Sequence, residues 1–217
     1  MFHCPYYDSN FALYRETPST SFIRVLHASP NAPAVDVYVN DKLTVKNLPF
    51  KGFSNYVPVP AGSYNVKVYP AGKKDTAVID TNVDIPARTI ITAAAVGSLP
   101  NLSLLPVFEP LFNRVPGKTY VRFVHLSPDA PSVDVTSGGK KIFTNTTFKK
   151  ITDYIQVNPG VYNFDVNVSE SGQRVLYVPN IRLLPNRIYT FYAVGLAGNN
   201  PPLQVLIPLD GNSYLKV

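Results

Sequence analysis

Apolar and polar residues alternate over short stretches along most of the chain. Val35, Val37 and Val39 alternate with Asp36 and Tyr38, and this period of two places one set of side chains on each face of a β-strand. In the first half of the chain, the pattern predicts strands at residues 22–28, 35–39, 43–45, 53–59, 64–68, 78–85, 88–96 and 102–108. No stretch combines a helical period with capping residues, so we predict almost no helix.

The chain repeats itself at an offset of 98 residues. The stretch HASPNAPAVDVY at His27–Tyr38 returns as HLSPDAPSVDVT at His125–Thr136. Further matches at this offset pair Asn47 with Asn145, Phe50 with Phe148, Tyr56 with Tyr154, Gly62 with Gly160, and Tyr64 with Tyr162. Short strands at regular spacing are typical of a sandwich or barrel, and the repeat predicts two such domains. We place them at 21–109 and 119–217 and expect each to fold alone.

Two segments lie outside the repeats. Residues 1–20 form an N-terminal arm rich in Phe and Tyr, which we expect to cover a sheet edge of its own domain or of a neighbouring molecule. Residues 110–118 contain two prolines and several apolar side chains. We therefore expect a stiff linker, with Leu111 or Phe112 packed at the domain junction.

The composition is that of a globular protein. The chain has 217 residues, of which 45% are hydrophobic and 16% are charged, and these proportions exclude an intrinsically disordered chain. The net charge is +6, but the lysine doublets lie near predicted turns and no nucleic-acid-binding motif accompanies them. We expect solvated hairpin tips and no nucleic-acid partner, with weak attraction to an anionic polymer as the alternative.

Cysteine content and hydropathy bear on the cellular location. Cys4 is the single cysteine, so a disulfide within the chain is excluded, and oxidation could only join Cys4 to another molecule. No signal peptide is visible and no apolar run is long enough to cross a membrane. We expect cytoplasmic synthesis, with a spore or cell surface as the destination.

The repeated His-Asp stretch is the main candidate site. If the proline-rich segment joins two antiparallel neighbours, His27 faces Asp36 and His125 faces Asp134, within hydrogen-bonding reach. We favour a structural corner, in which the aspartate holds the imidazole or binds backbone amides nearby. A catalytic relay of Ser29, His27 and Asp36 lacks a nucleophile elbow, and a metal site at His27 and Asp36 lacks a third ligand. We therefore predict no catalytic residue, cofactor or metal.

Two tyrosines are further structural candidates. Tyr64 and Tyr162 each follow a turn that contains proline and glycine. A tyrosine in this position often bonds back to a main-chain group and locks the corner. The alternative, stacking against a glycan, is the minority interpretation because the chain contains no tryptophan.

The segments Arg24–Asn40 and Tyr56–Tyr64 resemble the bacterial family called domain of unknown function 4397. The resemblance covers both copies, at about 22–108 and 120–208. The second copy departs at Thr136–Lys140, where the family has a tyrosine-containing strand and a turn. The resemblance implies two tandem immunoglobulin-like antiparallel β-sandwich domains, usually found on exported or surface proteins of bacteria. It implies no established activity, so it transfers no functional residue to this chain.

Three hypotheses of function follow. The first is a non-enzymatic structural or adhesive protein of a bacterial cell or spore surface, which assembles with itself through the arm. The second is a binding module that takes a small molecule or an anionic polymer through the loops at the sandwich ends. The third is a hydrolase that uses His27, Ser29 and Asp36.

Overall fold

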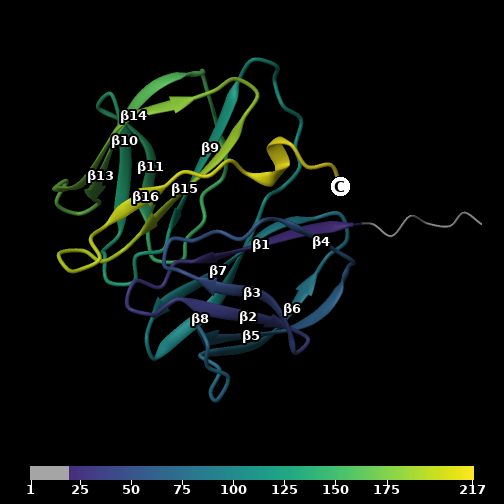
Figure 1. Cartoon of the computed structure of the whole chain (residues 1–217). Coiled ribbons are helices and arrows are strands. Elements are labelled where there is room, and N and C mark those ends of the chain that lie inside the picture. Colours follow the sequence, from purple (N-terminus) through teal and green to yellow (C-terminus); the bar gives the residue numbers. More distant parts are fainter. Residues whose placement is uncertain (1–19) are drawn as a thin grey trace, which may run out of the picture.

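The computed structural model describes residues 20–217 and contains two β-sandwiches in tandem (Figure 1). The predicted fold class, two immunoglobulin-like β-sandwich domains with almost no helix, is confirmed. A single 3-10 turn, Gly211–Ser213, is the helical element in this part of the chain. The predictions made for the arm and for Cys4 lie outside the described residues.

The first domain has eight strands, and their positions are close to those of the eight strands that the sequence pattern predicts. They are β1 (Ser21–His27), β2 (Val35–Val39), β3 (Lys42–Leu48), β4 (Val57–Val59), β5 (Gly62–Pro70), β6 (Ile79–Ile85), β7 (Ile90–Ser98) and β8 (Asn101–Phe108). One sheet has the order β4-β1-β7-β8 and the facing sheet has the order β3-β2-β5-β6.

The second domain has the same topology. Its strands are β9 (Thr119–His125), β10 (Val133–Ser137), β11 (Lys140–Thr146), β12 (Ile155–Val157), β13 (Gly160–Val168), β14 (Arg174–Leu183), β15 (Ile188–Val194) and β16 (Gln204–Leu206). The two sheets have the orders β12-β9-β15-β16 and β11-β10-β13-β14.

All pairings of these strands are antiparallel except one in each domain. Strand β1 pairs with β7 in parallel, and β9 pairs with β15 in the same way. The proline-rich segment after β1 therefore carries the chain from one sheet to the facing sheet, where β2 lies. The prolines suit this crossing because they cannot donate to a regular ladder.

The hairpin between the second and third strands has the same geometry in both copies, although its sequence differs. Asn40 and Asp41 have φ values of 48° and 61°, and Gly138 and Gly139 have φ values of 56° and 77°. A two-residue hairpin turn needs positive φ at both positions, which asparagine, aspartate and glycine tolerate. The second copy thus keeps its edge hairpin although it departs from the family pattern at Thr136–Lys140.

An apolar cluster joins the two domains. Its fully buried members come from β1, β7 and β8 of the first domain and from β9 and β15 of the second, together with the residues that follow β1 and β9: Leu26, Ala28, Ala94, Val96, Val107, Val124, Leu126, Tyr192 and Val194. Strands β9 and β15 are buried at every position, because one face lies in the domain core and the other against the partner domain. Figure 1 shows the two domains stacked on these strands.

A buried polar cluster crosses the same junction with approximate twofold symmetry. Arg24 Nε donates to Thr92 at 2.8 Å, and Arg24 Nη1 donates to the carbonyl of Leu209 in the other domain at 3.2 Å. Arg122 Nε likewise donates to Thr190 at 2.9 Å, and its Nη1 reaches back to the carbonyl of Phe108 at 2.7 Å. Each arginine therefore binds the main chain of the opposite domain.

Two carboxylates complete the polar cluster. Glu109 follows Phe108 and accepts hydrogen bonds from Tyr56 and Thr92, whereas Asp210 accepts from Tyr154 at 2.6 Å and from Thr190 at 2.5 Å. The side chains of Glu109 and Asp210 are fully buried, and Arg24 Nη2 lies 3.7 Å from Glu109 and 3.6 Å from Asp210. Burial, together with the charge of Glu109, raises the pKa of Asp210 to about 7.

The linker and the C-terminal residues also connect the domains. The Phe112 ring packs against Tyr120 and Tyr154, with ring centroids 4.9 and 5.5 Å away, whereas Leu111 is exposed. Asn212 donates its side-chain amide to the carbonyl of Pro110 at 3.1 Å. The segment after β16 thus lies over the junction, as the yellow end of the chain does in Figure 1.

Candidate ligand-binding site

The two repeated histidines tie down the proline-rich crossing. His27 Nε2 lies 2.9 Å from the carbonyl of Pro33, and His27 Nδ1 accepts the amide of Ser29 at 3.3 Å. His125 Nε2 lies 3.1 Å from the carbonyl of Pro131. Both imidazoles are buried, and burial lowers the pKa of each histidine below its ordinary value.

The two repeated aspartates bind backbone amides and not the histidines. Asp36 accepts the amides of Asn47 at 2.7 Å and Gly72 at 2.9 Å, and these bonds lower the pKa of Asp36. Asp134 makes a bond of 2.6 Å to the Lys141 ammonium, which, together with bonds from Ser169 and a backbone amide, lowers the pKa of Asp134 to about 2. Each aspartate thus bonds to the neighbouring edge strand, β3 or β11, and to the segment that follows β5 or β13.

The expected face-to-face placement of His27 and Asp36 is wrong. It assumed that β1 and β2 are antiparallel neighbours, whereas β1 lies between β4 and β7, and β2 belongs to the facing sheet. The same correction applies to His125 and Asp134. That these residues contribute to stability stays a prediction, and the contribution would now come from their bonds to the main chain.

The proposed catalytic and metal arrangements do not assemble. Ser29 Oγ is buried without a hydrogen-bond partner among residues 20–217, and the His27 nitrogens are engaged by the main chain. No group of three or more His, Cys, Asp and Glu side chains in the described part of the chain could hold a metal ion. The geometry thus offers no relay at His27, Ser29 and Asp36.

The two tyrosines after the glycine turns bond back to the main chain. Tyr64 Oη donates to the carbonyl of Pro60 at 2.9 Å, and Tyr162 Oη donates to the carbonyl of Asn158 at 2.7 Å. Each bond closes a stretch of five residues that includes the first three residues of β5 or β13. The contribution of these bonds to stability stays a prediction.

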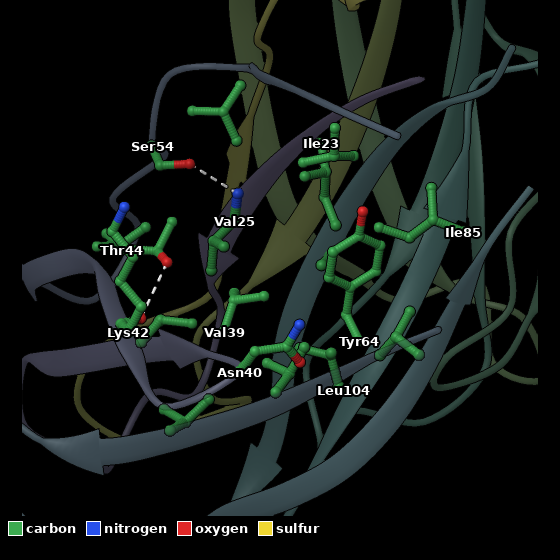
Figure 2. Close-up of a pocket in the computed structure, with 18 of the residues that line it drawn as sticks. Ile23, Val25, Val39, Asn40, Lys42, Thr44, Ser54, Tyr64, Ile85 and Leu104 are labelled. Carbon is green, nitrogen blue, oxygen red and sulfur yellow. Dashed lines mark hydrogen bonds between the residues drawn. The ribbon is translucent and has the colours of Figure 1, made fainter. Parts of the chain in front are cut away.

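The first domain contains a cavity of about 740 Å³ between its two sheets. Most of its wall consists of aliphatic side chains that point inward from both sheets: Ile23, Val25, Val37, Val39, Val45, Val57, Val59, Val66, Val68, Val83, Ile85, Ala93 and Leu104. Figure 2 shows Ile23, Ile85 and Leu104 around the space, with Lys42 and Thr44 at one side. This volume lies within the range of roughly 300–1,000 Å³ that is typical of small-molecule sites.

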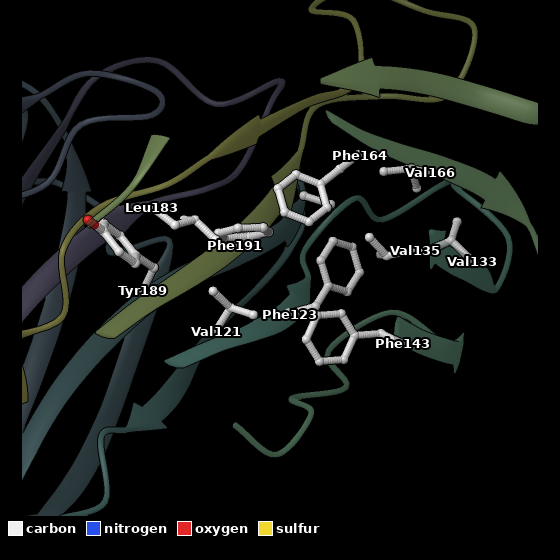
Figure 3. Packing of buried hydrophobic residues seen from close by; sticks show 11 residues of the cluster. Val121, Phe123, Val133, Val135, Phe143, Phe164, Val166, Leu183, Tyr189 and Phe191 are labelled. Carbon is white, nitrogen blue, oxygen red and sulfur yellow. The ribbon is translucent and has the colours of Figure 1, made fainter. Parts of the chain in front are cut away.

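The corresponding space in the second domain is filled. Its core holds Phe123, Phe143, Phe164 and Phe191, and the remaining void is about 10 Å³. Figure 3 shows these four rings packed between the sheets, where Phe164 and Phe191 meet edge to face with centroids 4.9 Å apart. A core without large voids is normal for a folded protein.

Four positions contribute to the difference between the copies. At the offset of 98 residues, the four phenylalanines correspond to Val25, Val45, Val66 and Ala93, and all four of these residues line the cavity. The first domain keeps the same backbone topology but lacks the four rings. The rings of the second copy therefore occupy space that is part of the cavity in the first.

The exposure of inward-facing side chains agrees with an open cavity. Phe123 and Val121 are 1% and 0% exposed in the second domain, whereas their counterparts Val25 and Ile23 are half-buried although they face the interior. Sequence reasoning missed this site because it compared what the copies share. The signal was present in the positions at which they differ.

The opening lies along the edge of the sandwich formed by β3 and β4. The lining includes exposed polar residues of β3 and of the segments beside β2 and β4, which are Asn40, Lys42, Thr44, Lys46 and Asn55. Strands β3 and β4 end their respective sheets on this side. A molecule could enter here without separation of any central strand pair.

The fold and this site together define a tandem β-sandwich protein with one packed domain and one hollow domain. The chain belongs to the family described as "Domain of unknown function (DUF4397)", whose model matches residues 21–136 and 120–213. No curated protein matches the sequence.

Several solved structures resemble the chain weakly. The Bacillus anthracis TIE protein has 13% identity and a TM-score of 0.27, over 82% of this chain and 34% of its own length. This chain therefore spans about a third of that protein. A streptococcal virulence factor that binds alpha-glucan has 10% identity and a TM-score of 0.26, over 91% of this chain and 100% of its own. A putative cell adhesion protein from Bacteroides ovatus has 10% identity and a TM-score of 0.25, over 88% and 96% of the two chains.

Proposed function

We propose that this is a non-enzymatic binding protein whose first domain encloses a small apolar molecule between its sheets, while the second domain serves as a packed structural partner. The observation that supports the proposal is the aliphatic cavity of about 740 Å³. A void of this size without an occupant forfeits the packing contacts of its whole lining. Of the three hypotheses from the sequence, this is the small-molecule binding module, with the ligand in the interior and not at the end loops.

A neutral dye that fluoresces in apolar surroundings, N-phenyl-1-naphthylamine, tests the proposal. We expect saturable binding to the full chain, with one dye per molecule. The double variant Val66→Phe/Ala93→Phe places the second domain's residues in the cavity and should weaken that binding. Leu43→Phe is the matched control because Leu43 is 40% exposed and lies outside the cavity lining. Equal binding by the double variant and the native chain would locate the dye elsewhere and refute the proposal.

A structural or adhesive role at a bacterial cell or spore surface is the second candidate. The interdomain cluster supports it, because buried apolar contacts and the crossed bonds of Arg24 and Arg122 hold the two domains as one stiff unit. In this second candidate function, the protein assembles with itself through the N-terminal arm. No helix in residues 20–217 is long and apolar enough to cross a membrane.

A further inference from the structure

The charged residues that line the cavity carry one sign only. Lys42 and Lys46 both come from β3 and are exposed at the opening, and no carboxylate from residues 20–217 contributes to the lining. The nearby Asp41 is paired with Lys67 at 2.8 Å. Two lysines therefore line the opening, and the charge of Lys46 also helps to lower the pKa of Asp36. An opening lined by lysines attracts an anion.

The polar atoms deeper in the lining are bonded within the protein. Ser54 Oγ accepts the amide of Val25 at 2.8 Å and donates to the carbonyl of Asn55 at 3.0 Å, and Figure 2 shows the first of these bonds at the cavity wall. Tyr64, the single aromatic residue of the lining, donates its hydroxyl to Pro60. What remains for a ligand is a surface of methyl and methylene groups, which suits an aliphatic chain and offers little to a polar one.

From these two features we propose that the occupant is an anionic amphiphile with a single aliphatic tail, such as a free long-chain carboxylate, with its tail between the sheets and its acid group beside Lys42 and Lys46. This inference rests on the proposed function and adds the chemical class of the ligand. The second domain could not take such a molecule, because four phenylalanine rings occupy the equivalent space.

Displacement of N-phenyl-1-naphthylamine by two homologous series tests the inference. The first series is the straight-chain carboxylates of eight, ten, twelve and fourteen carbons, and the second is the alcohols of the same lengths. Each methylene that enters the cavity should tighten binding about fourfold. The carboxylates should bind more tightly than the matching alcohols by about two- to fivefold per lysine at low salt, and the difference should shrink as salt is added.

The lysines are tested by Lys42→Gln/Lys46→Gln, which should remove the preference for carboxylate and keep the dependence on chain length. Lys73→Gln/Lys74→Gln is the matched control, since it removes the same charge from the β5–β6 turn of the same domain. Equal affinity for alcohols and carboxylates would overturn the anionic class and leave the proposed function standing. Affinity that does not depend on chain length would overturn both.

Vesicles that contain phosphatidylglycerol separate a free amphiphile from a membrane lipid. We expect the chain to stay in the supernatant when such vesicles are sedimented, and monomeric carboxylates to displace the dye without them. Sedimentation with the vesicles, together with failure of the monomeric carboxylates to displace the dye, would overturn the inference in favour of a membrane-bound headgroup.

Discussion

Replacement of Ala93 by phenylalanine tests whether the first domain is hollow. Ala93 is 3% exposed and lies beside Val25 on the neighbouring parallel strand. In a packed core, a ring added at such a position forces neighbours off their rotamers and costs about 1–3 kcal/mol. In this domain, the ring has a cavity of about 740 Å³ to enter.

The expected magnitude follows from the buried surface. Full burial of a phenylalanine side chain stabilises the folded state by about 1.5–3 kcal/mol, and the lost rotamer entropy of the ring offsets a part of this gain. Its counterpart Phe191 shows that the backbone accepts a ring here, since Phe191 is 2% exposed in the same topology. We therefore expect Ala93→Phe to leave stability unchanged or to raise it by about 1–2 kcal/mol.

Urea unfolding of the full chain, followed by circular dichroism, measures this change. The reciprocal variant Phe191→Ala is the control and should cost about 3–5 kcal/mol, because it empties a packed core. Changes in stability of opposite sign for the two variants would indicate one packed and one hollow domain. A loss of about 1–3 kcal/mol for Ala93→Phe would mean that the first domain is already packed, and the ligand site would fall with it.

Three further predictions concern other parts of the molecule. The pKa of Asp210 in the folded protein is raised to about 7. The stability that the protonated Asp210 carboxyl contributes should therefore be complete below about pH 4 and be lost as the pH rises through 7. Asp210→Asn should flatten the change in urea midpoint between about pH 5 and 8, and parallel curves for the two proteins would contradict this. His27→Ala and His125→Ala should each lower stability by about 1–3 kcal/mol, because the bond between a buried imidazole and a main-chain carbonyl is lost; unchanged urea midpoints would show that the corner does not depend on the imidazoles. A chain that starts at Ser21 should run as a monomer in light scattering while the full chain associates. If both chains run as monomers at high concentration, with and without reductant, the hypothesis of assembly through the arm fails.

Strands and turns were predictable because their signals are local. The alternation in β2 and the Asn40–Asp41 turn depend on neighbours in the sequence, and they appear where the pattern places them. The pairing of His27 with Asp36 failed because sheet membership is decided by the parallel contact between β1 and β7, which are far apart in the chain. Local alternation contains no information on that contact.

The buried polar cluster and the cavity escaped prediction for different reasons. Arg24 and Arg122 match at the offset of 98 residues, but Glu109 and Asp210 do not, because the second copy is longer before its final strand. For the cavity, the differences at Val25 and Ala93 were visible in the sequence. A smaller residue alone does not say whether the two sheets move together to fill the space, and the structure shows that they do not.

The crossed arginines link the folding of the first domain to the progress of synthesis. Arg24 needs the Leu209 carbonyl and the Asp210 carboxylate, which are translated about a hundred residues after Glu109. At ~5–20 residues per second, the ribosome takes roughly 5–20 seconds to produce them. During that interval Arg24 and the apolar face of the nascent first domain lack the partners that the second domain later supplies.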